Sequence, residues 1–170
     1  MVESARVAVV VGNPKAASRT RAVGETVARR VIAATGLAAG EPEVIELADL
    51  GPHLFDWSSA AVKAGVGTLA ASRIAVIATP VYKATYTGLL KAFLDWFGQT
   101  GLAGVTAIPV MVGAAPQHAL AVEVHLRPLL VEIGATVPTR GLFVLEHELD
   151  TLDDTLTTWL ETALPYLPTA

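Results

Sequence analysis

The first segment whose residue types could bind a charged group is residues 12–20, Gly-Asn-Pro-Lys-Ala-Ala-Ser-Arg-Thr. It follows an apolar run and leads into an expected helix. The N-terminus of a helix offers unpaired N–H groups and the positive end of its dipole, which together suit phosphate. Ser18 and Thr20 can add hydroxyl donors, while Lys15 and Arg19 add positive charge. Two interpretations stay open here: a phosphate site, or a helix that Ser18 only caps.

Two further segments also follow expected strands. Residues 79–88, Thr-Pro-Val-Tyr-Lys-Ala-Thr-Tyr-Thr-Gly, combine proline and tyrosine into a wall against which a planar heteroaromatic ring could lie. The alternative is a rigid loop whose tyrosines pack on the next helix. Residues 113–118, Gly-Ala-Ala-Pro-Gln-His, let a ligand approach the backbone closely, although a lone histidine such as His118 is often only a surface or capping residue. Open α/β sheets bind ligands beyond the carboxyl ends of their strands, so these segments predict one shared site.

Several other chemistries are excluded by what the sequence lacks. It contains no G-x-G-x-x-G turn after its first strand and no G-x-x-x-x-G-K-[ST] loop, the signatures of dinucleotide-binding folds and P-loop nucleotidases. Acidic residues that would hold magnesium are missing from the strand ends, so we expect an anion site without a metal. His53, His125 and His147 lack metal-ligand spacing. Cysteine is absent, which excludes disulfides, thiolate metal sites and a cysteine nucleophile.

The hydrophobic pattern predicts the elements that must position these segments. Short β-branched runs are typical of strands covered on both faces. The expected strands are residues 7–11, 43–47, 73–79, 106–113 and 141–145, and the expected helices are residues 18–35, 87–98, 116–134 and 150–164. Residues 48–67 are expected to form a loop with one helical turn. The alternation predicts an α/β fold, a doubly wound five-stranded parallel sheet with helices on both faces, in a single domain over residues 1–170.

Two of the expected helices carry additional signals. In the helix at 87–98, Leu89 and Trp96 form an apolar face beside the main stripe, which favours burial against another subunit. In the helix at 116–134, Pro128 removes a backbone hydrogen bond and predicts a kink. Asp150 or Thr151 is expected to cap the last helix. The spacing also predicts two i,i+4 ion pairs, Lys91 with Asp95 and Glu123 with Arg127.

Composition narrows the class of partners. Of the 170 residues, 52% are hydrophobic and 16% are charged, against about 25% charged in typical globular chains. Such a low share of charged residues favours burial of part of the surface in an interface with another subunit. The net charge of −4 gives no basic footprint for nucleic acid. No apolar run approaches the ~18 residues of a membrane span, and no targeting segment stands out, so we expect a cytoplasmic protein.

Taken together, these segments resemble the NAD(P)H-dependent FMN reductase family, which has the flavodoxin-like fold. The similarity is greatest to alkanesulfonate-type flavin reductases, which serve two-component monooxygenases. It rests on residues 12–20, on Thr-Pro-Val-Tyr-Lys-Ala-Thr-Tyr-Thr-Gly-Leu-Leu-Lys at 79–91, and on residues 113–118. Residues 120–135 add to it. The resemblance implies hydride transfer from reduced nicotinamide to N5 of FMN, with no catalytic side chain and no metal.

The resemblance also implies which residues contact the cofactor. The first loop would hold the FMN phosphate, the second would line the isoalloxazine ring, and the third would touch the other edge of the ring. The implied FMN-binding residues are Asn13, Lys15, Ser18, Arg19, Thr20, Pro80, Val81, Tyr82, Lys83, Gly113, Ala114 and His118. The family further implies a homodimer or homotetramer through the helix at 87–98, and a flavin-dependent monooxygenase as partner.

Three alternatives stay open at this point. The chain could hold FMN permanently and reduce quinones or azo dyes with NAD(P)H. It could be a flavodoxin-like electron carrier without turnover, although such carriers tend to be more acidic than a net charge of −4. It could also be a scaffold that has lost its ligand. The sequence does not discriminate between NADH and NADPH.

Overall fold

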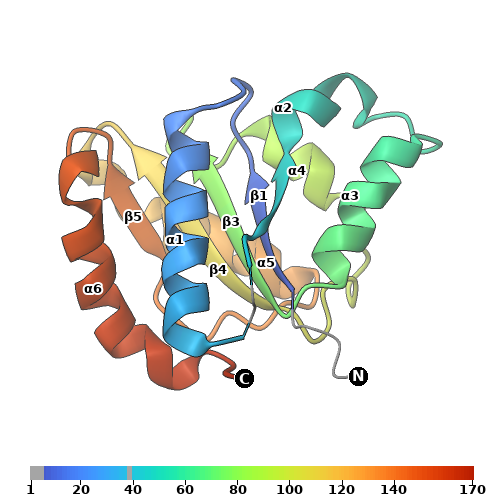
Figure 1. Ribbon diagram of the computed structural model, residues 1–170. Coiled ribbons are helices and arrows are strands. Elements are labelled where there is room, and N and C mark those ends of the chain that lie inside the picture. The colour runs from blue at the N-terminus through green and yellow to red at the C-terminus, as the bar shows by residue number, and fades with distance from the viewer. Residues whose placement is uncertain (1–5, 38–39) are drawn as a thin grey trace.

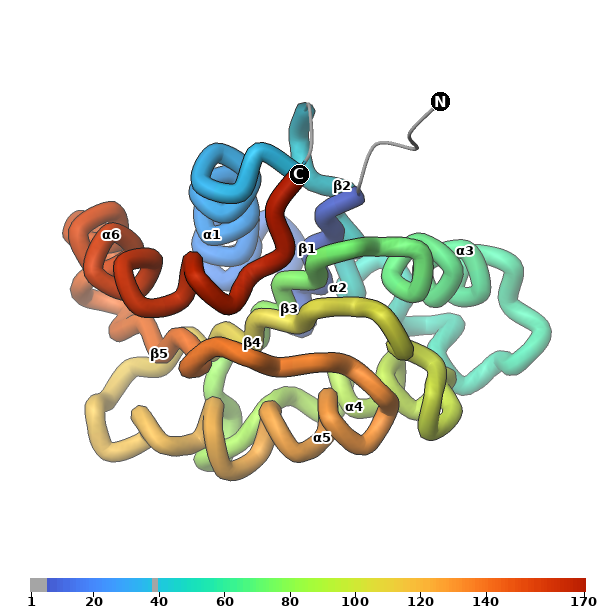
Figure 2. Tube along the Cα trace, turned by 90° about the horizontal axis from the view of Figure 1, so that it is seen from below, coloured from blue at the N-terminus to red at the C-terminus, as the bar shows by residue number. Residues whose placement is uncertain are grey.

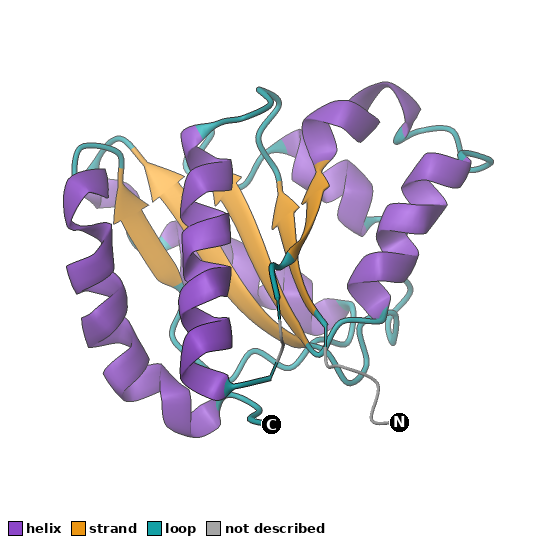
Figure 3. Cartoon of the chain, in the orientation of Figure 1, coloured by secondary structure: helices purple, strands orange, loops and turns teal. Residues whose placement is uncertain are grey.

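The structure, a computed structural model, describes residues 6–37 and 40–170. Its centre is a parallel sheet of five strands in the order β2-β1-β3-β4-β5 (Figure 3). The strands are β1 (Val7–Val11), β2 (Glu43–Glu46), β3 (Ile74–Pro80), β4 (Thr106–Gly113) and β5 (Leu142–Leu145). The predicted sheet is therefore confirmed, with strand ends shifted by a residue or less.

Helices cover both faces of this sheet, as predicted. One face is packed by α1 (Arg19–Thr35) and α6 (Leu152–Ala163), and the other by α3 (Ala60–Ala70), α4 (Gly88–Leu94) and α5 (Arg127–Glu132). Figures 1 and 2 show the two helical layers on opposite sides of the strands. A short helix, α2 (Leu47–Leu50), follows β2 directly. No helix within the described ranges is long and apolar enough to cross a membrane.

Burial explains why β1 is a continuous apolar run. Every residue of Val7–Val11 is at most 2% exposed, because β1 pairs with β2 and β3 while helices cover both of its faces. Helix α1 lies unusually close to the sheet at Gly24. A Cβ at this position would stand 2.9 Å from Cγ1 of Val9 and 3.0 Å from Cβ of Ala78. Glycine therefore sets the distance between α1 and the strands that it crosses.

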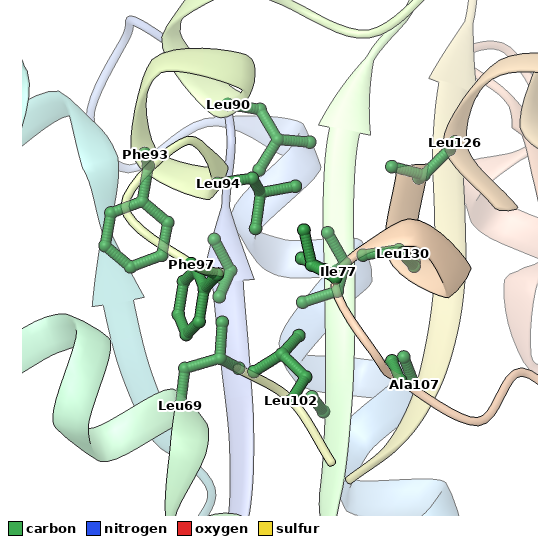
Figure 4. Close-up of a cluster of buried hydrophobic side chains, with 14 of the residues drawn as sticks. Leu69, Ile77, Leu90, Phe93, Leu94, Phe97, Leu102, Ala107, Leu126 and Leu130 are labelled. Carbon is green, nitrogen blue, oxygen red and sulfur yellow. The ribbon is translucent and has the colours of Figure 1, made fainter. Parts of the chain in front are cut away.

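The core on the other face is built around α4. Leu90, Phe93 and Leu94 are fully buried there, in the same hydrophobic cluster as Ile77 of β3 (Figure 4). The helix ends at Leu94, earlier than the predicted residue 98, and Thr87 caps its start through a 3.1 Å hydrogen bond from the Leu90 N–H. The predicted ion pair between Lys91 and Asp95 is confirmed at 2.6 Å.

The second apolar face after α4 is covered in part by the chain itself. The indole N–H of Trp96 donates to the carbonyl of Leu54 at 2.9 Å, and the Trp96 ring lies 4.7 Å from the ring of Trp57. Trp96 and Leu89 are both half-buried against the core. Within this chain residues 54–57 supply neighbours for Trp96, which stays half-buried, and burial of this face against another subunit stays a prediction.

Two other expectations about the elements need correction. Residues 48–67 are more than a loop, because the eleven-residue helix α3 begins at Ala60 with Ser59 as its cap. Thr151 occupies the N-cap position of the last helix, as one of the two predicted residues, but its side chain makes no capping hydrogen bond. The hydroxyl of Thr151 donates back to the carbonyl of Glu148 at 3.0 Å, and a 3-10 turn, Leu149–Thr151, precedes α6 instead.

The predicted helix at 116–134 is broken into three parts. A 3-10 turn, Pro116–His118, is followed by a π-helical segment, Val122–Leu126, and then by α5. The Arg127 N–H bonds to the carbonyl of Val122, five residues back, immediately before Pro128. Wider π-type spacing thus accommodates a proline whose missing N–H would interrupt an α-helix.

The predicted pair of Glu123 and Arg127 fixes this π-helical segment to the connection that precedes β5. The guanidinium of Arg127 bonds to the Glu123 carboxylate and also donates to the carbonyls of Val137 and Thr139. Glu123 in turn accepts the Gly141 N–H at 2.6 Å, just before β5. The Arg127 guanidinium lowers the pKa of the Glu123 carboxyl below its ordinary value by hydrogen bonding to it.

Candidate functional site

The carboxyl ends of the strands meet at one edge of the sheet, which is the upper edge in Figure 1. A cavity of about 310 Å³ opens there. It joins the loop after β1 to the end of β3, to Val112 within β4 and to Glu146 directly after β5. Its lining residues are Asn13, Lys15, Ala17, Ser18, Arg19, Thr20, Pro80, Tyr82, Val112 and Glu146. The first two of the three predicted segments therefore meet at one cavity, while their role as a binding site stays a prediction.

The loop after β1 is shaped by Asn13. Its side-chain amide donates to the hydroxyl of Thr20 at 3.0 Å and its carbonyl accepts the Lys15 N–H at 2.9 Å. These two bonds span the loop, and Ala17 completes the turn at a left-handed φ of 52°. Ser18 then caps α1 by accepting the Arg21 N–H at 3.2 Å. Ser18 therefore caps the helix and also lines the cavity, so its contact with a phosphate stays a prediction.

Buried hydroxyls connect the first segment to the second. The Thr87 hydroxyl donates to the carbonyl of Gly12 at 2.6 Å, while the Thr87 N–H bonds to the hydroxyl of Thr79 at 3.3 Å. Gly12 lies so close that an added Cβ would stand 2.9 Å from Cβ of Leu90. Two threonines and one glycine therefore hold the loop after β1 against the start of α4.

The segment after β3 makes a tight reversal. Tyr82 and Thr85 exchange backbone hydrogen bonds of 2.9 and 3.2 Å, and the two residues between them, Lys83 and Ala84, have φ of 51° and 66°. Positive φ at both central residues is the geometry of a type I′ turn. The reversal projects Tyr82 from the sheet edge, where 49% of the residue remains exposed beside the cavity.

The other predicted site residues lie outside the lining of this cavity. Val81 is half-buried and its N–H bonds to the carbonyl of Val112, while Lys83 is exposed in the turn. Gly113 is the last residue of β4, and a Cβ there would stand 2.7 Å from the ring of Phe143. Ala114 and His118 follow in the next turn. The third segment thus neighbours the site without enclosing the cavity.

Sequence reasoning missed Ala17, Val112 and Glu146. Glu146 comes directly after β5, and its carboxylate lies 3.2 Å from the Arg19 guanidinium. Inspecting the end of the last expected strand would have found it. The statement that acidic residues are missing behind the strands was wrong, because Glu146 stands at the site and Glu46 ends β2.

Glu46 lies beneath the same loop and is almost entirely buried. One of its carboxylate oxygens bonds to Arg21 at 3.2 Å and the other has no hydrogen-bond partner. Burial raises the pKa of Glu46, and the bond to Arg21 opposes that rise. Arg21 is also held by Glu25 at 2.6 Å. Its charge is therefore directed to carboxylates, which leaves Lys15 and Arg19 as the cations that line the cavity.

A second, larger cavity of about 780 Å³ lies between the π-helical segment, β5 and α6. Its lining includes Glu123, Phe143 and Trp159, together with several α6 threonines. The predicted site residues are not among those that line it. The hydrogen bonds from Arg127 and Gly141 already engage Glu123, and the Trp159 indole donates to the carbonyl of Arg140 at 2.8 Å.

Comparison with known proteins identifies the family. A family model described as NADPH-dependent FMN reductase matches residues 5–150, so the chain belongs to that family. The FMN reductase (NADPH) of Escherichia coli (strain K12) is 36% identical over 95 residues, which cover 52% of this chain and 50% of that protein. The NADH-dependent FMN reductase SfnF of Pseudomonas putida is 28% identical over 150 residues, covering 85% of this chain and 80% of that protein.

Solved structures agree with this assignment. The apo form of NADH:FMN oxidoreductase (EMOB) superposes with a TM-score of 0.85 at 30% identity, over 98% of this chain and 91% of that one. Oxidised flavodoxin 1 of Bacillus cereus, at 19% identity and a TM-score of 0.60, covers 96% of this chain and 99% of its own and shares the fold. The flavodoxin-like fold class is thereby confirmed. The match to the Escherichia coli relative spans only half of that relative's length.

Proposed function

We propose that this chain is an NAD(P)H-dependent FMN reductase. The observation that carries the proposal is the cavity in which the cationic loop after β1 meets Pro80 and Tyr82. Membership of the FMN reductase family supports the same activity. When bound, FMN supplies a ring that accepts a hydride from reduced nicotinamide at N5. The chain itself must then bind the phosphate, orient the ring and favour negative charge beside it.

The residues at the cavity suit the phosphate of FMN. Ser18 and Thr20 are buried at the start of α1, and each hydroxyl accepts one hydrogen bond from the chain, which leaves its proton available to a ligand. The N-terminal N–H groups of α1 face the same region, where they attract an anion. Lys15 and Arg19 add charge from the exposed rim. Asn13 acts by holding the loop in shape, because its amide already bonds to Thr20 and Lys15.

The segment after β3 suits the flavin ring. Pro80 and Tyr82 line the cavity next to the phosphate-binding loop, and Val81 and Lys83 belong to the same reversal. We assign the ring to this exposed wall, with Gly113, Ala114 and His118 along its other edge. In this arrangement backbone N–H groups stabilise charge on the reduced ring, and no side chain is assigned as acid or base.

A titration of the purified chain tests the proposal. Lys15→Met should weaken FMN binding roughly tenfold, since it removes one cation from a phosphate contact, whereas riboflavin binding should stay unchanged. Lys63→Met, an exposed lysine of α3 remote from the cavity, is the matched control. Oxidation of NADH and of NADPH is then followed with and without added FMN. Absence of FMN binding by the unaltered chain would refute the assignment.

The same kinetic measurements distinguish two hypotheses: that FMN is a substrate released after its reduction, and that FMN is a permanently bound cofactor. Turnover that rises with added FMN and saturates indicates a reductase that releases its product. Turnover only with a quinone or azo dye, by a chain that purifies yellow, indicates a bound-FMN reductase instead. Binding of FMN without any turnover indicates an electron carrier.

We further propose a cytoplasmic homodimer or homotetramer that uses the region at 87–98 and delivers reduced FMN to a flavin-dependent monooxygenase. The low charged content of 16% supports a subunit interface. So does the exposed apolar surface of Phe55 and Trp57 beside Trp96. Light scattering on the purified chain tests assembly, and a single cooperative unfolding transition tests the expected single domain.

A further inference from the structure

The cavity assigned to the phosphate contains a carboxylate that a phosphate site does not need. Glu146 lines it together with Lys15, Ser18 and Arg19, and it is the one acidic residue among the described residues of that lining. Its position is fixed by the backbone, since the Glu146 N–H donates to the carbonyl of Gly113 at 2.9 Å. A turn closed by the Glu148 N–H and the Leu145 carbonyl follows at once.

Stability does not explain the placement of Glu146. Its ion pair with Arg19 spans 3.2 Å, and the two side chains are 38% and 65% exposed. Ion pairs this open to solvent typically contribute about 0–1 kcal/mol. By comparison, Arg21 and Glu46 form a pair in which the carboxylate side chain is only 6% exposed. The Arg19–Glu146 pair is thus expected to contribute little to the stability of the fold, while both of its charges line the cavity.

Two electrostatic effects of Glu146 act in the same direction. Its negative charge repels a phosphate placed in the same cavity, and at 4 Å two unit charges interact by about 1 kcal/mol even in bulk water. It also holds Arg19, one of the two cations available to that phosphate. Lys15 has no ion-pair partner among the described residues and remains available to the phosphate.

We propose that Glu146 is an affinity-limiting residue that keeps FMN exchangeable. The inference rests on the proposed function and deepens it, because weak binding suits a chain that takes up oxidised FMN and releases the reduced form. Glu146 acts on the phosphate and not on the ring. Its effect therefore appears with FMN and is absent with riboflavin, which has the same ring and ribityl chain but no phosphate.

Glu146→Gln tests this inference against Glu148→Gln, a neighbouring acid that is not part of the cavity lining. We expect the dissociation constant for FMN to fall about fivefold in the Glu146 variant, as the loss of one ~1 kcal/mol repulsion implies. Riboflavin binding should not change, and the Glu148 variant should match the unaltered chain. The gain should shrink in high salt, because ions screen exposed charges. The variant should also retain more FMN through gel filtration.

Other outcomes overturn the inference. Unchanged or weaker FMN binding by Glu146→Gln would show that the carboxylate does not oppose the phosphate. Equal changes for FMN and riboflavin would place Glu146 on the ribityl chain or the ring. If the unaltered chain binds no FMN, the proposed function fails by itself. The same two variants titrated with inorganic phosphate then decide the role of Glu146, with tighter phosphate binding by Glu146→Gln supporting it and no difference refuting it.

Discussion

Replacing Thr87 by valine should destabilise the fold and loosen the loop after β1 together. The buried Thr87 hydroxyl donates to the carbonyl of Gly12 at 2.6 Å and accepts the Leu90 N–H at 3.1 Å as the cap of α4. Valine keeps the volume of the side chain and removes both hydrogen bonds. Loss of a helix cap costs about 1 kcal/mol, and a buried carbonyl left without its donor costs about 1–3 kcal/mol. We therefore expect a loss of about 2–4 kcal/mol.

Urea denaturation of Thr87→Val and Thr87→Ser measures this effect. Serine keeps the hydroxyl and removes one methyl group, which should cost about 1 kcal/mol. The free energy of unfolding, taken from the midpoint and slope of each transition, should therefore fall further for valine. Under the proposed function, FMN binding should also weaken more in the valine variant. If valine is no less stable than serine, the Thr87 hydroxyl does not anchor the loop and the reasoning fails.

Further predictions concern single positions. The folded protein lowers the pKa of Glu123, so its ionised carboxylate stabilises the fold at pH values above the ordinary pKa of 4.5. This contribution to the free energy of unfolding is lost as the pH falls through the lower pKa of the folded state. Glu123→Gln should therefore flatten the dependence of the urea midpoint on pH in that acid range. Gly113→Ala should lower the melting temperature, since its Cβ would stand 2.7 Å from the Phe143 ring, and overpacking of this kind costs about 1–3 kcal/mol. Ala84→Gly should raise the melting temperature by roughly 2–4 °C, because φ is 66° there and relief of a left-handed residue is worth about 1 kcal/mol; an unchanged melting curve would contradict the inferred backbone strain.

Strand prediction from the sequence succeeded because buried parallel strands leave a simple signal. Val7–Val11 and Thr106–Gly113 are buried throughout, so their apolar runs coincide with the strand bounds. Helix α3 was missed because its sequence, AAVKAGVGTLA, buries only Val62 and Leu69 and contains two glycines. The break at 119–126 was missed because a π-helical segment depends on hydrogen-bond spacing, which no residue type specifies.

The candidate site was predictable where local chemistry and topology coincide. Pro80 ends β3, and Ser18 lies in the loop after β1. These two strands are neighbours in the sheet, so strand order brings both residues to the same edge. Glu146 was within reach of the same argument, because it directly follows the expected strand at 141–145, whereas Ala17 carries no side-chain chemistry that would mark it. The contact of Trp96 with residues 54–57 was also out of reach, because it depends on how a long irregular connection folds back.

The close packing of α1 on the sheet at Gly24 limits how far the loop after β1 can move to accommodate a ligand. With Val9 and Ala78 within about 3 Å of where a Cβ would be, α1 can neither roll nor sink to follow a ligand. The direction of its amino-terminal N–H groups is thereby set by the backbone packing. Because α1 is held in place, a change in ligand preference has to come from the side chains that line the cavity and not from movement of the helix.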